Sequence, residues 1–203
     1  MCLFARFAWD RGLGAQGVRV VKALNEPHGH AVCLSKPITH VSGILMNKAT
    51  IPAAQKLAIS LLLDDHRKVK KLFREFESVK NDTRKEEIVR EACMELTVHT
   101  QIEEELFYPA LRDGDNEAFG DLVDEAVVEH AGAKNLIAEL ESMKPGDDLY
   151  DAKFTVLAEY IEHHVKEEEE ELFPKVIRKK IALEEVGAAM VERKEALMAE
   201  AVA

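Results

Sequence analysis

From about residue 52 onward, apolar residues recur every three or four positions, which is the spacing of one face of an α-helix. Turn-forming and helix-capping residues interrupt this pattern at 81–83, 112–115 and 144–148. The pattern predicts four long helices, at about 52–80, 84–112, 119–143 and 149–180. Long helices on short connections favour an antiparallel up-down-up-down bundle, and the sequence has no strand-like alternation. We therefore predict an all-α four-helix bundle.

The same pattern divides the chain into three parts. Residues 1–50 carry Gly, Pro and His without periodicity, and we expect an irregular leader outside the fold. This leader is either a weak organelle-targeting segment or, as we favour, an upstream extension ahead of a start at Met46. Residues 51–181 hold the four bundle helices. Residues 182–203 form an additional amphipathic helix, which we expect to cap the bundle or to face a partner.

Composition and charge narrow the class of protein and of partner. A content of 47% hydrophobic and 32% charged residues is ordinary for a soluble, helix-rich protein. The net charge of −11 argues against a nucleic-acid partner, because phosphates would repel such a surface. No run approaches the ~18–20 apolar residues that a membrane helix needs. The three cysteines are odd in number and unrelated in spacing, which suits a reducing, cytoplasmic compartment better than a disulfide framework.

One motif occurs twice, once in each half of the predicted bundle. In each half a lone His lies on one helix, and a His-x-x-x-Glu pair lies on the next, followed by an aromatic residue and a proline. Side chains four residues apart share one face of a helix, so each pair offers two ligand groups on one side. The six residues are His66, His99 and Glu103 in the first half and His130, His164 and Glu168 in the second.

These residue types predict a metal site, and most simply one for two metal ions. Imidazole suits iron, zinc, copper and nickel, while a carboxylate can bridge two ions. The sequence has neither a zinc-type HExxH segment nor the Glu-x-x-His spacing of ferritin-like bundles. In this layout each ion takes roughly two histidines and both glutamates span the pair. A bridging oxide or hydroxide would leave an open coordination position, which suits O2, peroxide or NO.

On these residues the chain resembles the hemerythrin-like (HHE cation-binding) domains, over about residues 57–180. The segments that carry the resemblance are DDHRKVKKLF, HTQIEEELFYP, VEHAGAKNLI and HHVKEEEEELFP. The resemblance implies a non-haem diiron centre, inside a four-helix bundle, that handles O2 or related small molecules. It also implies terminal ligands at His66, His99, His130 and His164, and bridging ligands at Glu103 and Glu168.

The chain departs from the oxygen-carrying hemerythrins one turn after His130. Those proteins have a second histidine there, whereas this chain has Lys134. One iron therefore loses a ligand or recruits another. Glu95 and Tyr160, each one turn before a ligand histidine, are the predicted substitutes or supporting residues. A more open, protonatable site favours sensing or redox turnover over stable oxygen carriage.

Neighbouring residues are expected to pack or to face solvent. His163 adjoins a ligand but is turned about 100° around the helix, so we expect it at the surface or supporting the ligands. Glu104 and Glu169 belong to acidic runs that we expect to be solvated. Cys93 is predicted to be a small core residue. The predicted apolar wall of the site consists of Phe73, Phe107, Tyr108 and Phe173.

The sequence is compatible with three candidate functions. The leading one is a non-haem diiron protein that binds O2 or a related ligand, for sensing, scavenging or storage. The alternative is a diiron peroxidase, a catalase-like enzyme or an NO-handling enzyme, which the missing histidine favours and the lack of a CxxC redox motif disfavours. The third is an iron-binding module whose fold responds to metal occupancy. Sequence leaves open the oligomeric state and whether manganese or zinc replaces iron.

Overall fold

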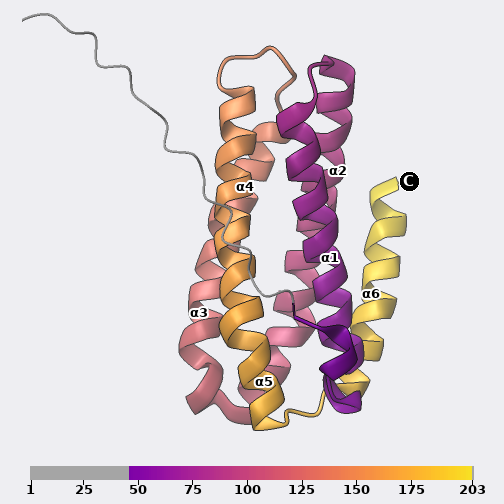
Figure 1. Ribbon diagram of the computed structural model, residues 1–203, viewed down its shortest axis with the longest axis vertical. Coiled ribbons are helices and arrows are strands. Elements are labelled where there is room, and N and C mark those ends of the chain that lie inside the picture. The colour runs from indigo at the N-terminus through magenta and orange to yellow at the C-terminus, as the bar shows by residue number, and fades with distance from the viewer. Residues whose placement is uncertain (1–45, 203) are drawn as a thin grey trace, which may run out of the picture. The chain divides into compact units, whose positions relative to one another are not determined.

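The computed structural model describes residues 46–202, which form helices joined by short connections (Figure 1). The elements are η1 (Lys48–Thr50), α1 (Ala53–Ser78), α2 (Asp82–Ile102), η2 (Glu103–Phe107), α3 (Tyr108–Glu141), α4 (Tyr150–Glu167), η3 (Glu168–Leu172), α5 (Phe173–Lys179) and α6 (Glu184–Val202). No strand occurs among these residues, and the all-α prediction is confirmed. None of the described helices is long and apolar enough to cross a membrane. The prediction for residues 1–45 lies outside the described part of the chain.

Four helical rods make the bundle, and two of them run through several elements. α2, η2 and the first turns of α3 form the second rod, while α4, η3 and α5 form the fourth (Figure 1). Within α3 the backbone is extended at Asp115 (φ −165°, ψ 79°), where the second rod ends and the third begins. The Asp115 carboxylate accepts the backbone N–H of Ala118 at 3.1 Å and so caps the new helix. The break predicted at 112–115 therefore lies at Asp115.

Two apolar clusters fill the bundle, with a polar layer between them. The first is built mainly from α1, η2, α3, α5 and α6, and the second from α1 to α4. Along α1, the first cluster ends at Leu63 and the second begins at Val69, and the buried residues between them are Asp65 and His66. Cys93 belongs to the second cluster, where burial raises its pKa to about 12. The polar layer is therefore enclosed by apolar packing on both sides.

The last helix, α6, lies along the side of the bundle against α1 and α2 (Figure 1). Its contact with α1 is close at Gly187, where an added Cβ would lie 2.9 Å from the backbone nitrogen of Ala58. Glycine is the residue that permits this approach. Met190, one turn further along, is fully buried. The amphipathic C-terminal segment thus covers one face of the first two helices.

Candidate metal centre

The bundle brings the six motif residues together in the polar layer. All six side chains are buried, although the residues come from α1, α2, η2, α3, α4 and η3. They form two overlapping groups, each with ligand atoms within 4.8 Å of one another. The groups are His66, His99, Glu103 and Glu168, and Glu103, His130 and His164. The six residues that the spacing placed on facing helices therefore lie close together in the folded chain.

A π-helical turn follows each His-x-x-x-Glu pair and begins at the glutamate. In η2 the backbone N–H of Tyr108 donates to the carbonyl of Glu103, five residues earlier, and η3 repeats this pattern from Glu168. Each turn is followed by a proline, Pro109 or Pro174, which has no N–H to continue the regular helical bonding. Such turns are frequent at functional sites. These turns were not predicted from the sequence, although the proline at the same place in both repeats was the available signal.

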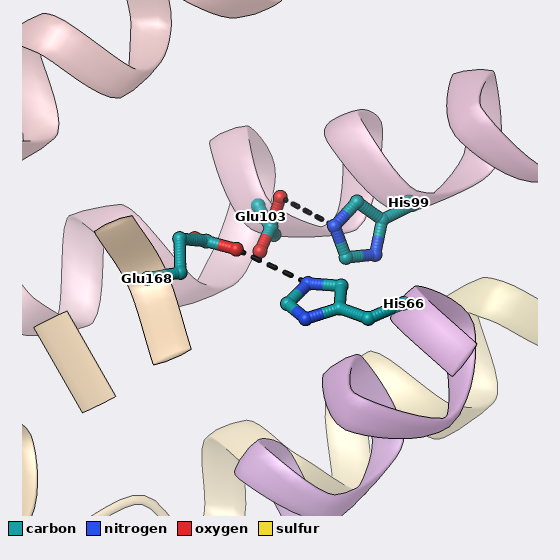
Figure 2. Close-up of side chains that lie close together, drawn as sticks. All are labelled: His66, His99, Glu103 and Glu168. Carbon is teal, nitrogen blue, oxygen red and sulfur yellow. Dashed lines mark ion pairs between the residues drawn. The ribbon is translucent and has the colours of Figure 1, made fainter. Parts of the chain in front are cut away.

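The carboxylates lie between the two halves of the centre. Figure 2 shows His66, His99 and the two glutamates pointing toward one another. Each carboxylate has an Oε2 atom within 3.6 Å of two histidine Nε2 atoms, one from each half. The pairs are Glu103 with His99 (3.2 Å) and His130 (3.4 Å), and Glu168 with His66 (3.2 Å) and His164 (3.6 Å). This is an arrangement in which both carboxylates can span two cations.

Five buried atoms at the centre make no hydrogen bond of acceptable geometry. They are His66 Nε2, His99 Nε2, both Glu103 oxygens and Glu168 Oε2. A buried polar group without a partner costs about 1–3 kcal/mol, so five such atoms at one place call for a ligand that pairs them all. Imidazole nitrogens and carboxylate oxygens without a cationic side chain among them fit metal cations. The residues present therefore fit a metal centre.

Each of the four histidines presents Nδ1 to a carboxylate on a neighbouring helix. The contacts are His66 with Glu169 (3.0 Å), His99 with Asp65 (3.4 Å), His130 with Glu104 (2.9 Å) and His164 with Glu129 (2.8 Å). A carboxylate at Nδ1 holds the ring in the tautomer that leaves the Nε2 lone pair facing the centre. Below, these four residues are called the outer carboxylates.

The expectation that Glu104 and Glu169 are solvated was wrong for Glu169 and holds only in part for Glu104, whose side chain is 30% exposed. The Glu169 side chain is only 10% exposed, and both carboxylates contact histidines. A signal for them was present in the repeat. In both halves an acidic residue directly precedes the lone histidine, and another directly follows the motif glutamate. Each of these four acidic residues reaches across to the neighbouring helix rather than to its own.

Neither predicted substitute for the missing histidine belongs to the centre. Glu95 is buried, but its carboxylate accepts a hydrogen bond from Lys68 Nζ at 2.7 Å. Tyr160 is 38% exposed and lies against Gly132. Lys134 itself donates to both oxygens of Glu104 at 2.7 Å, so it supports an outer carboxylate.

Tyr108 reaches the centre in their place. Its hydroxyl donates to Glu168 Oε1 at 3.1 Å and lies 3.4 Å from His130 Nε2. Burial, together with the charges of Glu103 and Glu168, raises the pKa of the Tyr108 phenol well above its usual value. The predicted wall residue is therefore also a protonated donor at the centre. Phe173, another predicted wall residue, stacks on His66 with the ring centroids 5.8 Å apart.

In the metal-free centre, the pKa shifts of the buried groups differ in direction from one residue to the next. Burial and the neighbouring Glu168 raise the pKa of Glu103 well above its usual value. Burial opposes ionisation of Glu168 too, but the nearby histidines outweigh it and lower the pKa of that carboxyl. Burial lowers the pKa of His99, and it lowers that of His130 to about 2. For His66, burial is outweighed by two adjacent glutamates, which raise its pKa.

A small apolar cavity adjoins the centre. Its volume is about 10 Å³, which is of the order of one water-sized molecule. The histidines at its edge are His66, His99 and His164, and its apolar walls include Val69, Leu96, Ile161 and Val165. A ligand that enters it must be very small.

His163 lies outside this centre, on the outer side of α4. Its side chain is 62% exposed, which agrees with the predicted surface position. Its Nε2 lies 3.3 Å from Glu167 Oε1 and 3.6 Å from Oε1 of Glu129, the outer carboxylate of His164. His163, Glu129 and Glu167 form a further group whose ligand atoms lie within 4.8 Å of one another.

Comparison with known proteins agrees with this geometry. Residues 57–176 match the model of the Hemerythrin HHE cation binding domain. A solved structure of a hemerythrin HHE cation binding domain-containing protein from Mycobacterium kansasii is similar, with 26% identity, a TM-score of 0.61, and coverage of 71% of this chain and 89% of that one. A DNA nickase from Nostoc sp. (strain PCC 7120) is 30% identical over 113 residues, which is 54% of this chain but only 30% of the nickase. The family match includes both copies of the motif, and the chain therefore belongs to the hemerythrin HHE cation-binding domain family, whose domains bind metal cations.

Proposed function

We propose that the protein is a non-haem diiron protein that binds O2 or a related small ligand, in oxygen, iron or redox sensing, scavenging or storage. The observation that carries the proposal is the set of five buried donor atoms without hydrogen-bond partners. In this proposal His66 and His99 hold one iron and His130 and His164 hold the other. Glu103 and Glu168 lie between the pairs.

Bound iron would supply redox chemistry and a coordination position for a diatomic or peroxide ligand. The protein's own residues limit what can reach that position. The cavity of about 10 Å³ excludes larger molecules, and its apolar walls keep water scarce. The outer carboxylates fix the four imidazoles, so the Nε2 atoms remain directed at the metals.

A peroxidase-like, catalase-like or NO-handling enzyme is the second candidate, and Tyr108 favours it. A protonated phenol that donates to Glu168 is placed to hold or move a proton beside the ligand position. Reversible binding needs no such proton, whereas reduction of peroxide consumes protons. The two candidates share one metal centre and differ in whether Tyr108 takes part in turnover.

Anaerobic loading with Fe(II) tests the proposal, followed by a metal count and optical spectra on adding and removing O2. We expect about two irons per chain. Glu103→Ala and Glu168→Ala should lose paired binding while remaining helical by circular dichroism. Glu170→Ala, in the same acidic run but exposed, is the matched control and should load normally. One metal or none in the native protein, or two metals in both alanine variants, would contradict the proposal.

The likeness to a DNA nickase raises a nucleic-acid function only for that longer relative, of which this chain spans 30%. The net charge of −11 still favours a small ligand over DNA. The predicted lack of nucleic-acid binding is tested by a supercoiled-plasmid nicking assay with iron-loaded protein. Nicking that is lost in Glu168→Ala would establish the activity for this chain.

A further inference from the structure

Three of the four outer carboxylates are each paired with a lysine. The pairs are Glu169 with Lys70 (3.2 Å), Glu104 with Lys134 (2.7 Å) and Asp65 with Lys194. The first two lysines occupy equivalent places in the repeat, four residues after the lone histidine of each half. Lys194 comes from α6, which packs mainly against α1, α2 and η2 of the first half. The second half has no equivalent of α6 within the described residues.

Glu129, the fourth outer carboxylate, has no lysine partner, and its partners among the described residues are histidines. Its Oε2 atom contacts His164 Nδ1 at 2.8 Å, and Oε1 faces His163 Nε2 at 3.6 Å. Within residues 46–202, no lysine or arginine nitrogen lies within 4.0 Å of this carboxylate. What stands beside it is a second carboxylate, Glu167. Glu125 also acts on Glu167 electrostatically and adds to the negative charge.

We propose that Glu129, His163 and Glu167 form a separate, peripheral site for one divalent transition-metal cation, which balances Glu129 as a lysine balances each of the other three outer carboxylates. One imidazole and two carboxylates are a ligand set that Zn(II), Fe(II) and Mn(II) accept. His163 and Glu167 lie four residues apart on one face of α4, and Glu129 faces them from α3. The exposed His163 leaves the remaining coordination positions to water.

The peripheral site is connected to the buried centre by a single residue. Glu129 faces His163 through Oε1 and contacts His164 through Oε2. A cation at the peripheral site would therefore polarise the carboxylate that orients His164 in the buried centre. The site stands on its own three side chains and does not require two irons in the centre.

Zn(II) is a suitable probe because it is redox-inert and binds imidazole and carboxylate. Iron-loaded protein is titrated by calorimetry, while its optical spectrum and iron content show whether the centre stays intact. We expect one Zn(II) per chain, bound at least tenfold more weakly by His163→Gln and by Glu167→Gln. Glu162→Gln, which removes an exposed carboxylate from the same helix, should bind as the native protein does. Equal binding by all four proteins, or no binding by the native one, would overturn the proposal.

Glu167→Lys provides an independent test by supplying the missing cation covalently. It should abolish Zn(II) binding, and it should melt at or above the temperature of Glu167→Gln in metal-free buffer. A lower melting temperature for Glu167→Lys than for Glu167→Gln would show that a cation beside Glu129 is not stabilising, and it would overturn the proposal.

Discussion

The two halves of the bundle present the same ligands in different surroundings. In the first half, α6 lies over α1 and α2, and Lys194 from α6 supports Asp65 from a position only 18% exposed. In the second half, the outer face of α3 stays open, with Val128 69% exposed and Lys134 43% exposed. A repeated motif thus fixes which atoms face the centre, while the rest of the fold gives the two halves of the centre unequal surroundings.

The repeat also differs by one hydroxyl at the centre. Tyr108 and Phe173 occupy equivalent places, nine residues after His99 and His164. Both rings stack on a histidine of the centre, Tyr108 on His130 with centroids 5.6 Å apart and Phe173 on its counterpart in the first half. Only the tyrosine adds a donor. Tyr108 belongs to the first repeat by sequence, and it places this hydroxyl beside Glu168 and His130 of the second half.

Metal removal should have the largest effect on stability, and it should destabilise the second half of the bundle more than the first. Each of five unpaired buried atoms costs about 1–3 kcal/mol, so we expect the melting temperature to fall by on the order of 10 °C or more. Hydrogen exchange after chelation should rise more in residues 116–141 than in α1, because α6 holds the first half in place. Scanning fluorimetry and exchange mass spectrometry measure both effects. Equal exchange in the two halves would show that α6 does not protect its side.

Replacing Lys194 and Lys134 should give the next largest effect. The loss of unfolding free energy should differ between the two halves. Lys194→Met leaves the buried Asp65 without its cation, and we expect a loss of about 2 kcal/mol in urea unfolding. Lys134→Met removes a more exposed pair and should cost less than about 1 kcal/mol. Lys194→Arg keeps the charge and serves as the control. Similar losses for the two methionine variants would contradict the inequality of the halves.

Tyr108→Phe should make the two repeats alike at the centre. The fold should lose only about 1 kcal/mol, because one hydrogen bond to Glu168 is removed without a change of shape. If turnover uses the phenol, the peroxide reaction of the iron-loaded protein should slow at least about tenfold in stopped-flow measurements. A variant that binds O2 and reduces peroxide at native rates would restrict Tyr108 to a packing role.

The helices and the positions of the six motif residues followed from sequence because both depend on local spacing. Helical period and the four-residue step between His and Glu are properties of one helix. The two π-turns changed the local phase. After Glu168, which faces the centre, the next residue Glu169 also points inward, to His66, which an unbroken helix would not have predicted. The run of five glutamates by itself gave no sign of this, and the available signal was the acidic residue that follows the motif glutamate in both repeats.

Contacts between helices that are far apart in the sequence could not be predicted from the apolar pattern. Lys194 meets Asp65 only because α6 folds back along α1, and the amphipathic pattern of α6 did not specify which helix it covers. Likewise, nothing local distinguished Tyr108, which reaches the centre, from Tyr160, which lies at the surface. Such distinctions depend on the rotation of each helix about its axis.

Proton release on metal loading should show the smallest of these differences, which arises because the pKa is raised for His66 in the first half and lowered for His130 in the second. The pKa values of Glu103 and His66 are both raised, which favours the protonated form of these two groups in the metal-free protein. His99 and His130, whose pKa values are lowered, are already neutral there and release none. Because metals must displace bound protons, loading should release protons from these groups, and metal affinity should fall as pH falls. An indicator dye in weak buffer measures the release, and Glu103→Gln should lower it. Equal proton release by the native protein and by Glu103→Gln would show that Glu103 holds no proton in the metal-free centre.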